Sequence, residues 1–387
     1  MKILCRYIII LLIVCCLGNI SRGQSRDKGD YAPPVAVTVA NFPMALKGTS
    51  SIFYMNGTYW TANDHGDLII YNIDSTTGEI LRVIPFDIEI EDMEEIAQDA
   101  DYIYFGDFGD NLGERDNLRI FRLDKGDIAS GIFDFDTIEF WYPERNRWNR
   151  RNYDCESFVV GDSNFYLFTK RWNSLDCEVY SIPKRVGEWR ANLLGSFASD
   201  GLVTGCCYLP QFQLLTLCGY NTSCKPFVII IYDIESENFL DAKKLHVELG
   251  NEQGVQTEAI ISHDGIHYYL TNEYLALVSS YTPPRLLNLD LSPFLEDYVN
   301  GTGEVHRLAI AEKPRQQLGV FPNPTTRWLN ISGAEVCKIS IYNMRGQCVG
   351  EAFDQQQLDL SSLPSGCYTL VATAPDGTMR RATITKQ

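Results

Sequence analysis

The sequence predicts an all-β protein, in which a β-propeller of five blades is followed by a small C-terminal β-sandwich. Three observations support this. Between residues 48 and 293, short aromatic and β-branched runs alternate with turn signals such as Asn56-Gly57 and Asp264-Gly265. No run of that region shows a helical period over a dozen residues. Five similar units recur along it, which is typical of a radial array of sheets.

The repeated unit has a polar residue, a short apolar strand, a turn, a second apolar strand and a polar exit. The units read GTSSIFYMNGTYWTAND, DMEEIAQDADYIYFGD, DCESFVVGDSNFYLFTKR, LVTGCCYLPQFQLLTLCGY and QTEAIISHDGIHYYLTNE, and each is followed by a third strand. We call the polar starting positions the anchor residues, and they are Ser50, Glu94, Glu156, Thr204 and Glu258. Their spacings of 44, 62, 48 and 54 residues suit propeller blades.

The blade count depends on two strands outside these units. We expect the strand Val35–Ala40 to pair with the last unit and close the ring. Six blades is the alternative, because Thr137–Pro143 (TIEFWYP) could belong to a further unit. The predicted boundaries are a signal peptide, an extended lead-in, the propeller, a linker and a C-terminal domain, at residues 1–23, 24–47, 48–300, 301–317 and 318–387.

The first residues are typical of a secretory signal peptide. Lys2 and Arg6 form a basic start, and the apolar core Tyr7–Gly18 is too short to span a bilayer comfortably. Small residues at Ser21 and Gly23 predict cleavage before Gln24, leaving no transmembrane segment in the mature chain. A lipoprotein anchor at Cys15 or Cys16 is disfavoured, because the residues before them do not suit a lipobox.

The charge argues against a nucleic-acid-binding protein, and the cysteine spacing argues against a structural zinc site. The formal net charge of −17 argues against a nucleic-acid partner, and we interpret the basic run Arg145–Arg151 as a solvated surface loop. The nine cysteines after the signal peptide cannot all pair with one another, although Cys218 and Cys224 could close a loop. We expect Cys206 and Cys207 to be small buried residues. No spacing indicates a structural zinc site.

The last segment resembles the C-terminal sorting domain of type IX secretion substrates from Bacteroidetes. The matching motifs lie at Val320–Ser332 (VFPNPTTRWLNIS), Ile339–Val349 (ISIYNMRGQCV) and Leu358–Leu370 (LDLSSLPSGCYTL), followed by the turn Asp376-Gly377 and by Lys386. The resemblance implies recognition by the type IX machinery, passage through the periplasm, and release from the cell or attachment to the outer-membrane surface. An ordinary immunoglobulin-like module is the alternative.

The central region resembles uncharacterised β-propeller domains and, more distantly, the esterase-like phytase and SdiA-regulated propellers. Those groups carry a D-x-E-G pattern, which Asp92–Glu94, Asp154–Glu156 and Gln256–Glu258 match in part. Glu95, Ser157 and Ala259 stand where glycine is usual. These departures put any inherited catalytic activity in doubt.

A propeller would bring the anchor residues together, because the first strand of each blade lines the central channel. Glu94, Glu156 and Glu258 should therefore converge at one end of the channel, its mouth, with Ser50 and Thr204 between them. The ends of the second strands should add a second ring of polar residues: Asn63, Asp64, Asp107, Lys170, Arg171, Tyr220, Asn272 and Glu273. Of the five histidines, His65 alone falls at this end.

Converging carboxylates raise one another's pKa unless a cation or a basic side chain neutralises them. Calcium would suit such an oxygen-rich cluster, and Lys170 could act as an internal counter-ion. The loop Gly106–Asn117 also resembles a calcium loop in composition, with Asp107, Asp110 and Asn111 as candidate ligands, although it lacks the EF-hand order.

We therefore expect a secreted or surface-held propeller that binds a small molecule, glycan or protein at the mouth. One alternative is a calcium-assisted hydrolase of phosphoesters or glycans, with paired carboxylates as acid and base. Another is a structural surface module, in which the anchor glutamates only fix the ring.

Overall fold

The computed structural model divides into two compact units, Met1–Ile310 and Ala311–Gln387. It describes residues 32–146, 149–172, 174–251, 254–276, 281–306, 319–332, 338–343, 348–353, 357–373 and 379–387. Three predicted segments lie wholly or partly outside these residues. They are the signal peptide, the first part of the lead-in at residues 24–31, and most of the linker. Among the described residues, no helix has the length and apolar character needed to cross a membrane.

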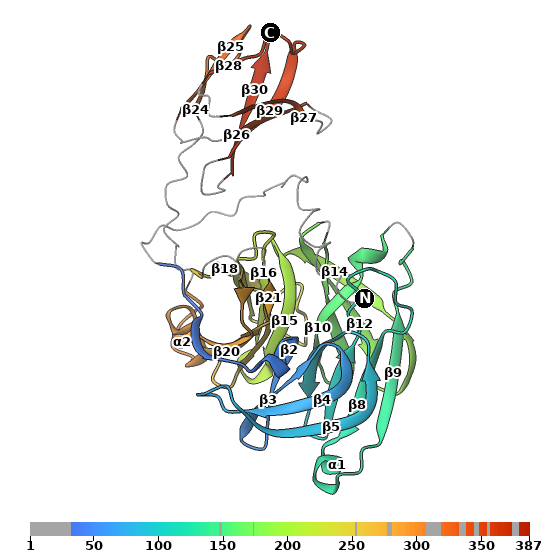
Figure 1. Ribbon diagram of the computed structural model, residues 1–387. Coiled ribbons are helices and arrows are strands. Elements are labelled where there is room, and N and C mark those ends of the chain that lie inside the picture. Colours follow the sequence, from blue (N-terminus) through green and yellow to red (C-terminus); the bar gives the residue numbers. More distant parts are fainter. Residues whose placement is uncertain are drawn as a thin grey trace. The chain divides into compact units, whose positions relative to one another are not determined.

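The first unit is all-β and propeller-like, with sheets of four or five mostly antiparallel strands that surround a common centre (Figure 1). The first sheet contains β2 (Thr49–Met55), β3 (Thr58–Asn63), β4 (Gly66–Ile73) and β5 (Ile80–Ile90). The second contains β6 (Met93–Gln98), β7 (Tyr102–Asp107), β8 (Arg119–Asp124) and β9 (Phe135–Trp141), with β13 (Gly187–Arg190) added in parallel to β9. The run Thr137–Trp141 therefore belongs to the second sheet.

The next two sheets repeat this order. The third contains β10 (Asp154–Val160), β11 (Asn164–Lys170), β12 (Asp176–Pro183) and β14 (Asn192–Ala198). The fourth contains β15 (Leu202–Leu209), β16 (Leu214–Tyr220), β17 (Pro226–Tyr232) and β18 (Lys243–Glu248). Burial falls outward, since β10 and β15 are almost wholly buried whereas β14 is mostly exposed.

The fifth sheet combines the two ends of the unit. It contains β19 (Thr257–Ser262), β20 (His267–Asn272), β23 (Arg285–Asp290) and, outermost, β1 (Val37–Asn41). β1 pairs antiparallel with β23, Val37 opposite Asn288 and Asn41 opposite Arg285. The N-terminal strand thus covers an edge that would otherwise expose unpaired backbone groups. A separate two-stranded ribbon is formed by β21 (Leu275–Ala276) and β22 (Tyr281–Thr282).

Hydrophobic cores join the sheets pairwise around the centre. Phe53 and Trp60 of the first sheet pack with Phe105 of the second, and Ile52 packs on the other side with Ala259 of the fifth. The inner strands also contact one another in cyclic order, β2 with β6, then β10, β15, β19 and again β2. Each sheet therefore has a neighbour on both faces, which explains why its central strands are apolar on both sides.

Local sequence explains the turns and the few helices. Asn56 and Gly57 both have positive φ, 52° and 84°, as a two-residue hairpin turn of type I′ requires. The sequence analysis foresaw no helix, but two short ones occur, α1 (Lys125–Ser130) and α2 (Ser292–Val299). The Asp124 side chain caps α1 by accepting from the Gly126 N–H, and both helices are too short to give a periodic signal.

The second unit consists of two small sheets around its own core. One contains β24 (Gly319–Phe321), β25 (Trp328–Ser332) and β28 (Gln357–Asp359). The other contains β27 (Cys348–Phe353), β26 (Lys338–Asn343), β29 (Gly366–Thr373) and β30 (Met379–Lys386). Leu329 of the first sheet packs with Ile339 and Leu370 of the second, so the two sheets enclose one hydrophobic layer.

Candidate functional site

The five anchor residues occupy one shared structural position. Each sits in a β-bulge near the start of an inner strand, between two residues that keep the ladder register: Ser50 in β2, Glu94 in β6, Glu156 in β10, Thr204 in β15 and Glu258 in β19. All five are at most 7% exposed. A bulge re-aims its residue and leaves it outside the regular pairing. The repeat seen in the sequence is therefore a repeat of bulges.

A buried ion pair forms where the third sheet reaches the mouth. Lys170 Nζ lies 2.9 Å from Glu156 Oε1. Burial alone lowers the pKa of Lys170, but the negative charges of Glu156 and its neighbours outweigh this and hold the pKa well above its ordinary value. The ammonium group also lies 5.0 Å from the Trp172 ring centroid. Lys170 is therefore a permanent positive charge beside the anchor residues, as the sequence analysis had proposed.

Three other carboxylates around this lysine have no such partner. Glu94, Glu258 and Glu273 accept no hydrogen bond and form no ion pair within the described part of the chain. Burial raises the pKa of Glu258 to about 7, against the opposing charge of Lys170. Burial, reinforced by neighbouring carboxylates, also raises the pKa of Glu94 and Glu273 well above the usual range. Among the described residues, the carboxyl groups around Lys170 therefore outnumber the positive charges that this one lysine can supply.

The remaining anchor and rim residues divide into two kinds. Thr204 Oγ1 donates to the Thr257 carbonyl at 2.5 Å, so it joins the fourth sheet to the fifth. Ser50 Oγ is buried and has no hydrogen-bond partner among the described residues. Tyr220 interacts with Lys170, and burial holds the pKa of its phenol well above the ordinary value. Ser50 and Tyr220 therefore remain candidates for ligand contact, whereas Thr204 has a structural partner.

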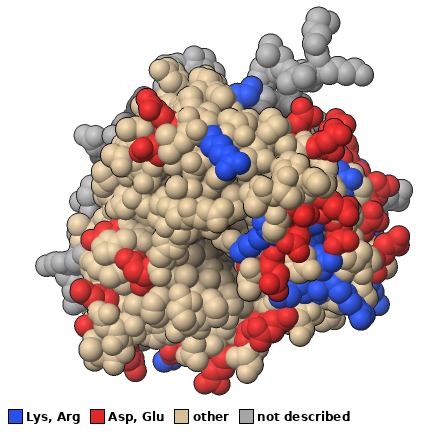
Figure 2. Space-filling view, turned by 90° about the horizontal axis from the view of Figure 1, so that it is seen from below, with Lys and Arg blue, Asp and Glu red and all other residues tan. Residues whose placement is uncertain are grey.

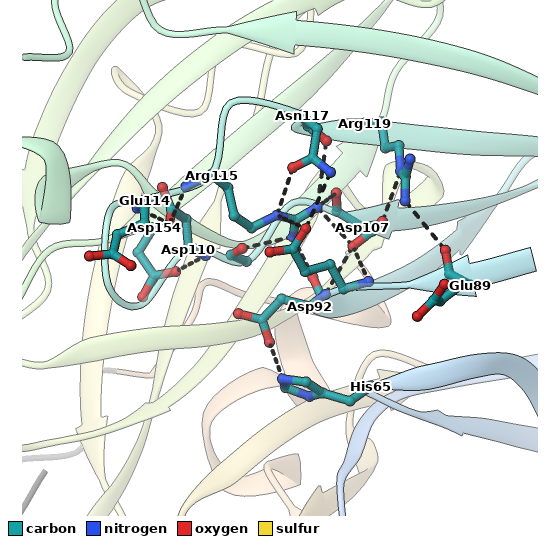
Figure 3. A network of polar contacts seen from close by, with 12 residues as sticks. His65, Glu89, Asp92, Asp107, Asp110, Glu114, Arg115, Asn117, Arg119 and Asp154 are labelled. Carbon is teal, nitrogen blue, oxygen red and sulfur yellow. Dashed lines mark hydrogen bonds and ion pairs between the residues drawn. The ribbon is translucent and has the colours of Figure 1, made fainter. Parts of the chain in front are cut away.

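Asp64, His65 and Asp92 form a second polar group at the rim. His65 lies in the turn between β3 and β4, with Nδ1 2.6 Å from Asp64 Oδ2 and Nε2 3.4 Å from Asp92 Oδ1. Figure 3 shows the imidazole and the Asp92 carboxylate pointing toward one another. Burial raises the pKa of Asp92 to about 7, although His65 acts against this shift. Asp92 precedes an anchor residue by two positions, and the sequence analysis did not count it as a site residue.

Asp107 does not face the mouth as the sequence analysis expected. Its Oδ1 accepts from the backbone N–H groups of Glu91 and Asp92 and from Arg115, and its Oδ2 accepts from Arg119 at 2.9 Å (Figure 3). The side chain is fully buried. Both oxygens are occupied, which argues against the predicted role as a ligand for calcium or substrate.

Asp110 is engaged in the same way. Its Oδ1 accepts from the N–H groups of Glu114 and Arg115, and its Oδ2 lies 2.6 Å from Arg145. Asn111 contributes its carbonyl oxygen to Arg151. Arginine side chains therefore hold this loop and occupy oxygens that a calcium ion would need. The basic run that the sequence analysis interpreted as a solvated loop supplies two of these arginines.

Two buried acids were missed because their partners are distant in sequence. Asp154 accepts from the Asp110 N–H at 2.7 Å and from Trp172 Nε1 at 3.0 Å. Glu95 lies on the inner strand β6, yet its carboxylate accepts from the Cys206 N–H of the fourth sheet at 3.2 Å. Burial raises the pKa of Glu95 well above its usual range. The D-x-E pattern offered a signal for Asp154, whereas nothing local marked Glu95.

The cysteines of this unit that lie in described residues are free thiols. Cys218 and Cys224 form no disulfide, so the loop closure suggested by their spacing does not occur. Cys207 is buried as expected, whereas Cys206 is partly exposed. Burial raises the pKa of both thiols, which keeps them protonated.

The space-filling view shows how charge is distributed on one face of the molecule. A hollow lies near the centre of this face, and lysine, arginine, aspartate and glutamate side chains gather on one side of it (Figure 2). The opposite side carries mostly uncharged residues. The charged groups are thus concentrated over part of the face only.

The solved structures that match this chain are distant from it. The extracellular domain of a proposed one component system from B. thetaiotaomicron is 11% identical, with a TM-score of 0.32 over 91% of this chain and 59% of that one. The chain thus spans less than two thirds of that protein. The GH43_1 enzyme from Xanthomonas citri, solved with xylose, is 11% identical, with a TM-score of 0.40 over 66% of this chain and 90% of that one. A glucose dehydrogenase is 10% identical, with a TM-score of 0.38, over 66% and 99% of the two chains.

No curated protein matches the sequence. The tail, by contrast, has an assigned family, since residues 319–386 match the model of the secretion system C-terminal sorting domain. This agrees with the ordered motifs of the sequence and indicates a secreted or cell-surface protein that the type IX machinery recognises. The second unit of the chain is thus a secretion system C-terminal sorting domain.

Proposed function

We propose that the first unit is a five-bladed propeller, exported by type IX secretion, that binds a small ligand at the mouth of its channel. The observation that carries this proposal is a set of carboxylates around Lys170, the buried Glu94 and Glu258 and the half-buried Glu273, that accept no hydrogen bond from a described residue. Removing carboxylates from water costs free energy, which a bound cation or hydrogen-bond donor would offset. A fold that needed only structural acids would have paired them, as it does Asp107.

The chemistry of the mouth favours a ligand that carries positive charge or several hydroxyl groups. Glu94, Glu258 and Glu273 supply acceptors, and Lys170 is already engaged by Glu156. Ser50 adds a buried hydroxyl that has no partner within the described residues. A cationic group would lower the pKa of the carboxylates and replace the protons that burial favours. An amine, an amino sugar or a calcium ion with an attached glycan fits these requirements.

We place calcium in this proposal at the glutamates that have no partner among the described residues. Calcium takes six to eight oxygen ligands, often from carboxylates. Asp107 and Asp110, the candidate aspartates of the Gly106–Asn117 loop, have both carboxylate oxygens engaged by the protein. Glu94, Glu258 and Glu273 have such oxygens.

A binding screen on the mature full-length chain tests the proposal. The probes are calcium chloride, glucosamine, spermidine, xylose and glucose, each added in EDTA or in excess calcium, with the melting temperature as the readout. We expect at least one probe to raise the melting temperature, and we expect Glu94→Gln, Glu258→Gln and Ser50→Ala each to reduce that shift. Glu139→Gln is the matched control, since Glu139 is an exposed carboxylate on β9.

Two outcomes would reject ligand binding at the mouth. One is an unchanged melting temperature with every probe in both buffers. The other is an equal shift in the wild type and in the three mouth variants. Either result would favour the structural module, in which the anchor residues only maintain the ring.

A hydrolase is the second candidate, and it rests on the pKa of about 7 that burial gives to both Asp92 and Glu258. A carboxylic acid that titrates near neutral pH can serve as a general acid. The check is turnover of nitrophenyl glycosides and nitrophenyl phosphate between pH 5 and 9. Activity that Glu258→Gln abolishes and Glu139→Gln leaves intact would establish catalysis, and no turnover would reject it.

A further inference from the structure

The rim of the channel brings together three groups that can bind a metal ion. Asp64 and His65 end the first hairpin of the first sheet, and Asp92 precedes β6 of the second sheet. One ligand atom from each of these residues lies within 4.8 Å of the others. The imidazole stands between the carboxylates, Nδ1 toward Asp64 and Nε2 toward Asp92 (Figure 3).

We propose that Asp64, His65 and Asp92 form a binding site for a divalent transition metal ion of the zinc class. Imidazole nitrogen suits zinc, copper, iron and nickel, whereas calcium and magnesium prefer oxygen alone. Zinc–nitrogen and zinc–oxygen bonds of about 2.0–2.2 Å in a tetrahedron place neighbouring ligand atoms roughly 3.3–3.5 Å apart. His65 Nε2 and Asp92 Oδ1 are 3.4 Å apart. This separation matches two ligands of one ion.

The shorter contact to Asp64 supports the same site. His65 Nδ1 and Asp64 Oδ2 are 2.6 Å apart, which is a hydrogen-bond distance. A carboxylate on the far nitrogen of a metal-binding histidine fixes the ring and its tautomer. Asp64 therefore orients the imidazole so that Nε2 faces Asp92.

A buried acid beside Asp92 supports the same site. Glu94 is 7% exposed and forms no hydrogen bond or ion pair with a described residue. A Cβ atom on Gly109 would lie 2.2 Å from Glu94 Oε1 and 2.9 Å from Asp92 Oδ2. The two carboxylates thus approach each other beside the backbone of Gly109. A side chain at this position would collide with both of them. An ion at Asp92 would offset the charge repulsion between them.

The backbone already joins the two sheets at this point. The Asp64 N–H donates to the Gly48 carbonyl at 2.9 Å, and the Asp64 carbonyl accepts from the Met93 N–H at 2.8 Å. Both ends of the proposed site are therefore positioned by hydrogen bonds of the fold. An ion bound here would link the first and second sheets and raise the stability of the ring.

Two other histidines provide matched controls, because each contacts a single carboxylate. His267 Nδ1 lies 2.7 Å from Asp264 Oδ2, and His306 Nε2 lies 2.6 Å from Asp297 Oδ2. Their exposure is close to that of His65. They share the histidine–aspartate pair with the proposed site but lack the second aspartate.

Zinc titration of the mature full-length chain tests this site. Thiols are alkylated first, because free cysteines bind zinc, and binding is measured by calorimetry and by the melting temperature. We expect one zinc ion per chain, an affinity at least 100-fold lower in His65→Gln and Asp92→Asn, and a 10–100-fold loss in Asp64→Asn. His267→Gln should bind zinc as the wild type does. Excess calcium should not compete.

The site is rejected if the wild type binds no zinc, or if His65→Gln binds it as tightly as the wild type. The melting temperature of each variant without metal shows whether it folds, and His65→Gln decides the question if Asp92→Asn does not. The inference shares the observation on Glu94 with the proposed ligand site, but its metal ligands, Asp64, His65 and Asp92, are different residues. Because the ligand screen includes an EDTA arm and the zinc titration contains no organic probe, failure of one is distinguishable from failure of the other.

Discussion

Lys170 Nζ lies 2.9 Å from Glu156 Oε1, and both side chains are buried at the inner edge of the third sheet. The pair joins the end of β11 to the bulge of β10. In the strand ladder, Lys170 lies opposite Asp154, two residues before Glu156. Lys170 is the one lysine in the described residues that interacts with Glu94, Glu156, Glu258 and Glu273 together. It therefore sets the electrostatic balance of the mouth.

Replacing Lys170 with methionine should destabilise the propeller by about 3–5 kcal/mol at pH 7, because the Glu156 carboxyl is left buried without its partner and must either bind a proton or stay an uncompensated charge. Urea unfolding followed by tryptophan fluorescence measures this. The double variant Lys170→Met with Glu156→Gln should recover part of the loss. Equal unfolding midpoints for the wild type and Lys170→Met would show that the ion pair does not stabilise the fold.

Stability should fall as the pH rises from about 4.5 to about 7. Glu258 has an ordinary pKa of 4.5, which burial raises to about 7 in the folded chain. Between these values the folded state binds more protons than the unfolded state, so the free energy of unfolding decreases with pH and then levels off. Melting temperatures from pH 5 to 8 measure the slope. Glu258→Gln should flatten it, and a slope unchanged by this variant would contradict the assignment.

Asp107→Asn should destabilise the second sheet far more than an exposed ion-pair variant. Asp107 is fully buried between Arg115 and Arg119. The variant leaves those guanidinium groups without their counter-ion and places an amide N–H₂ group where one acceptor oxygen stood, which should cost about 3–5 kcal/mol. The control is Asp136→Asn, because Asp136 is exposed and pairs with the half-buried Arg122. An exposed pair contributes about 0–1 kcal/mol. Similar denaturation midpoints for both variants would refute a structural role for Asp107.

Removing β1 should unfold or aggregate the first unit. A chain that begins at Pro43 loses the outermost strand of the fifth sheet and exposes the edge of β23. A chain that begins at Ala32 retains β1 and serves as the control. Circular dichroism and gel filtration of the two chains measure the difference. A folded monomer without β1 would show that the ring closes without its N-terminal strand.

Deleting residues 318–387 should stop export across the outer membrane while leaving the first unit folded. The two units have separate hydrophobic cores, and residues 319–386 match the sorting-domain family. Fractionation of the native host locates the truncated chain, which should accumulate in the periplasm. The same tail fused to a periplasmic reporter should direct that reporter outward. Normal export of the truncated chain would contradict the sorting role.

The anchor residues show how far the sequence could predict the site. Their recurrence predicted that Ser50, Glu94, Glu156, Thr204 and Glu258 share one position, and each lies in a β-bulge of an inner strand. A bulge recurs with the repeat because both belong to the local strand. The partner of each residue does not recur, since it comes from another sheet. Hence Thr204 binds a carbonyl of the fifth sheet while Ser50 Oγ has no partner among the described residues.

Asp107 and Lys170 illustrate the same limit. Both end the second strand of their sheets, so the sequence placed both at the mouth. Lys170 meets Glu156 there, whereas Asp107 turns to Arg115 and Arg119, which follow it at a distance of 8 and 12 residues. Composition alone made that loop resemble a cation site. Which charges neutralise which is decided by packing, because electrostatic pairing depends on separations in space.

The sequence by itself determined the all-β character, the repeated strand pattern and the sorting tail, because strand alternation and turn residues are local properties. Tertiary structure alone decided which carboxylates are paired and which are not. It pairs Asp107 and Asp110 with arginines and places His65 between two aspartates. It leaves Glu94, Glu258 and Glu273 without hydrogen-bond partners in the described chain. The reason is physical: a carboxylate's burial and its neighbours, not its position in the repeat, fix its charge and its chemistry.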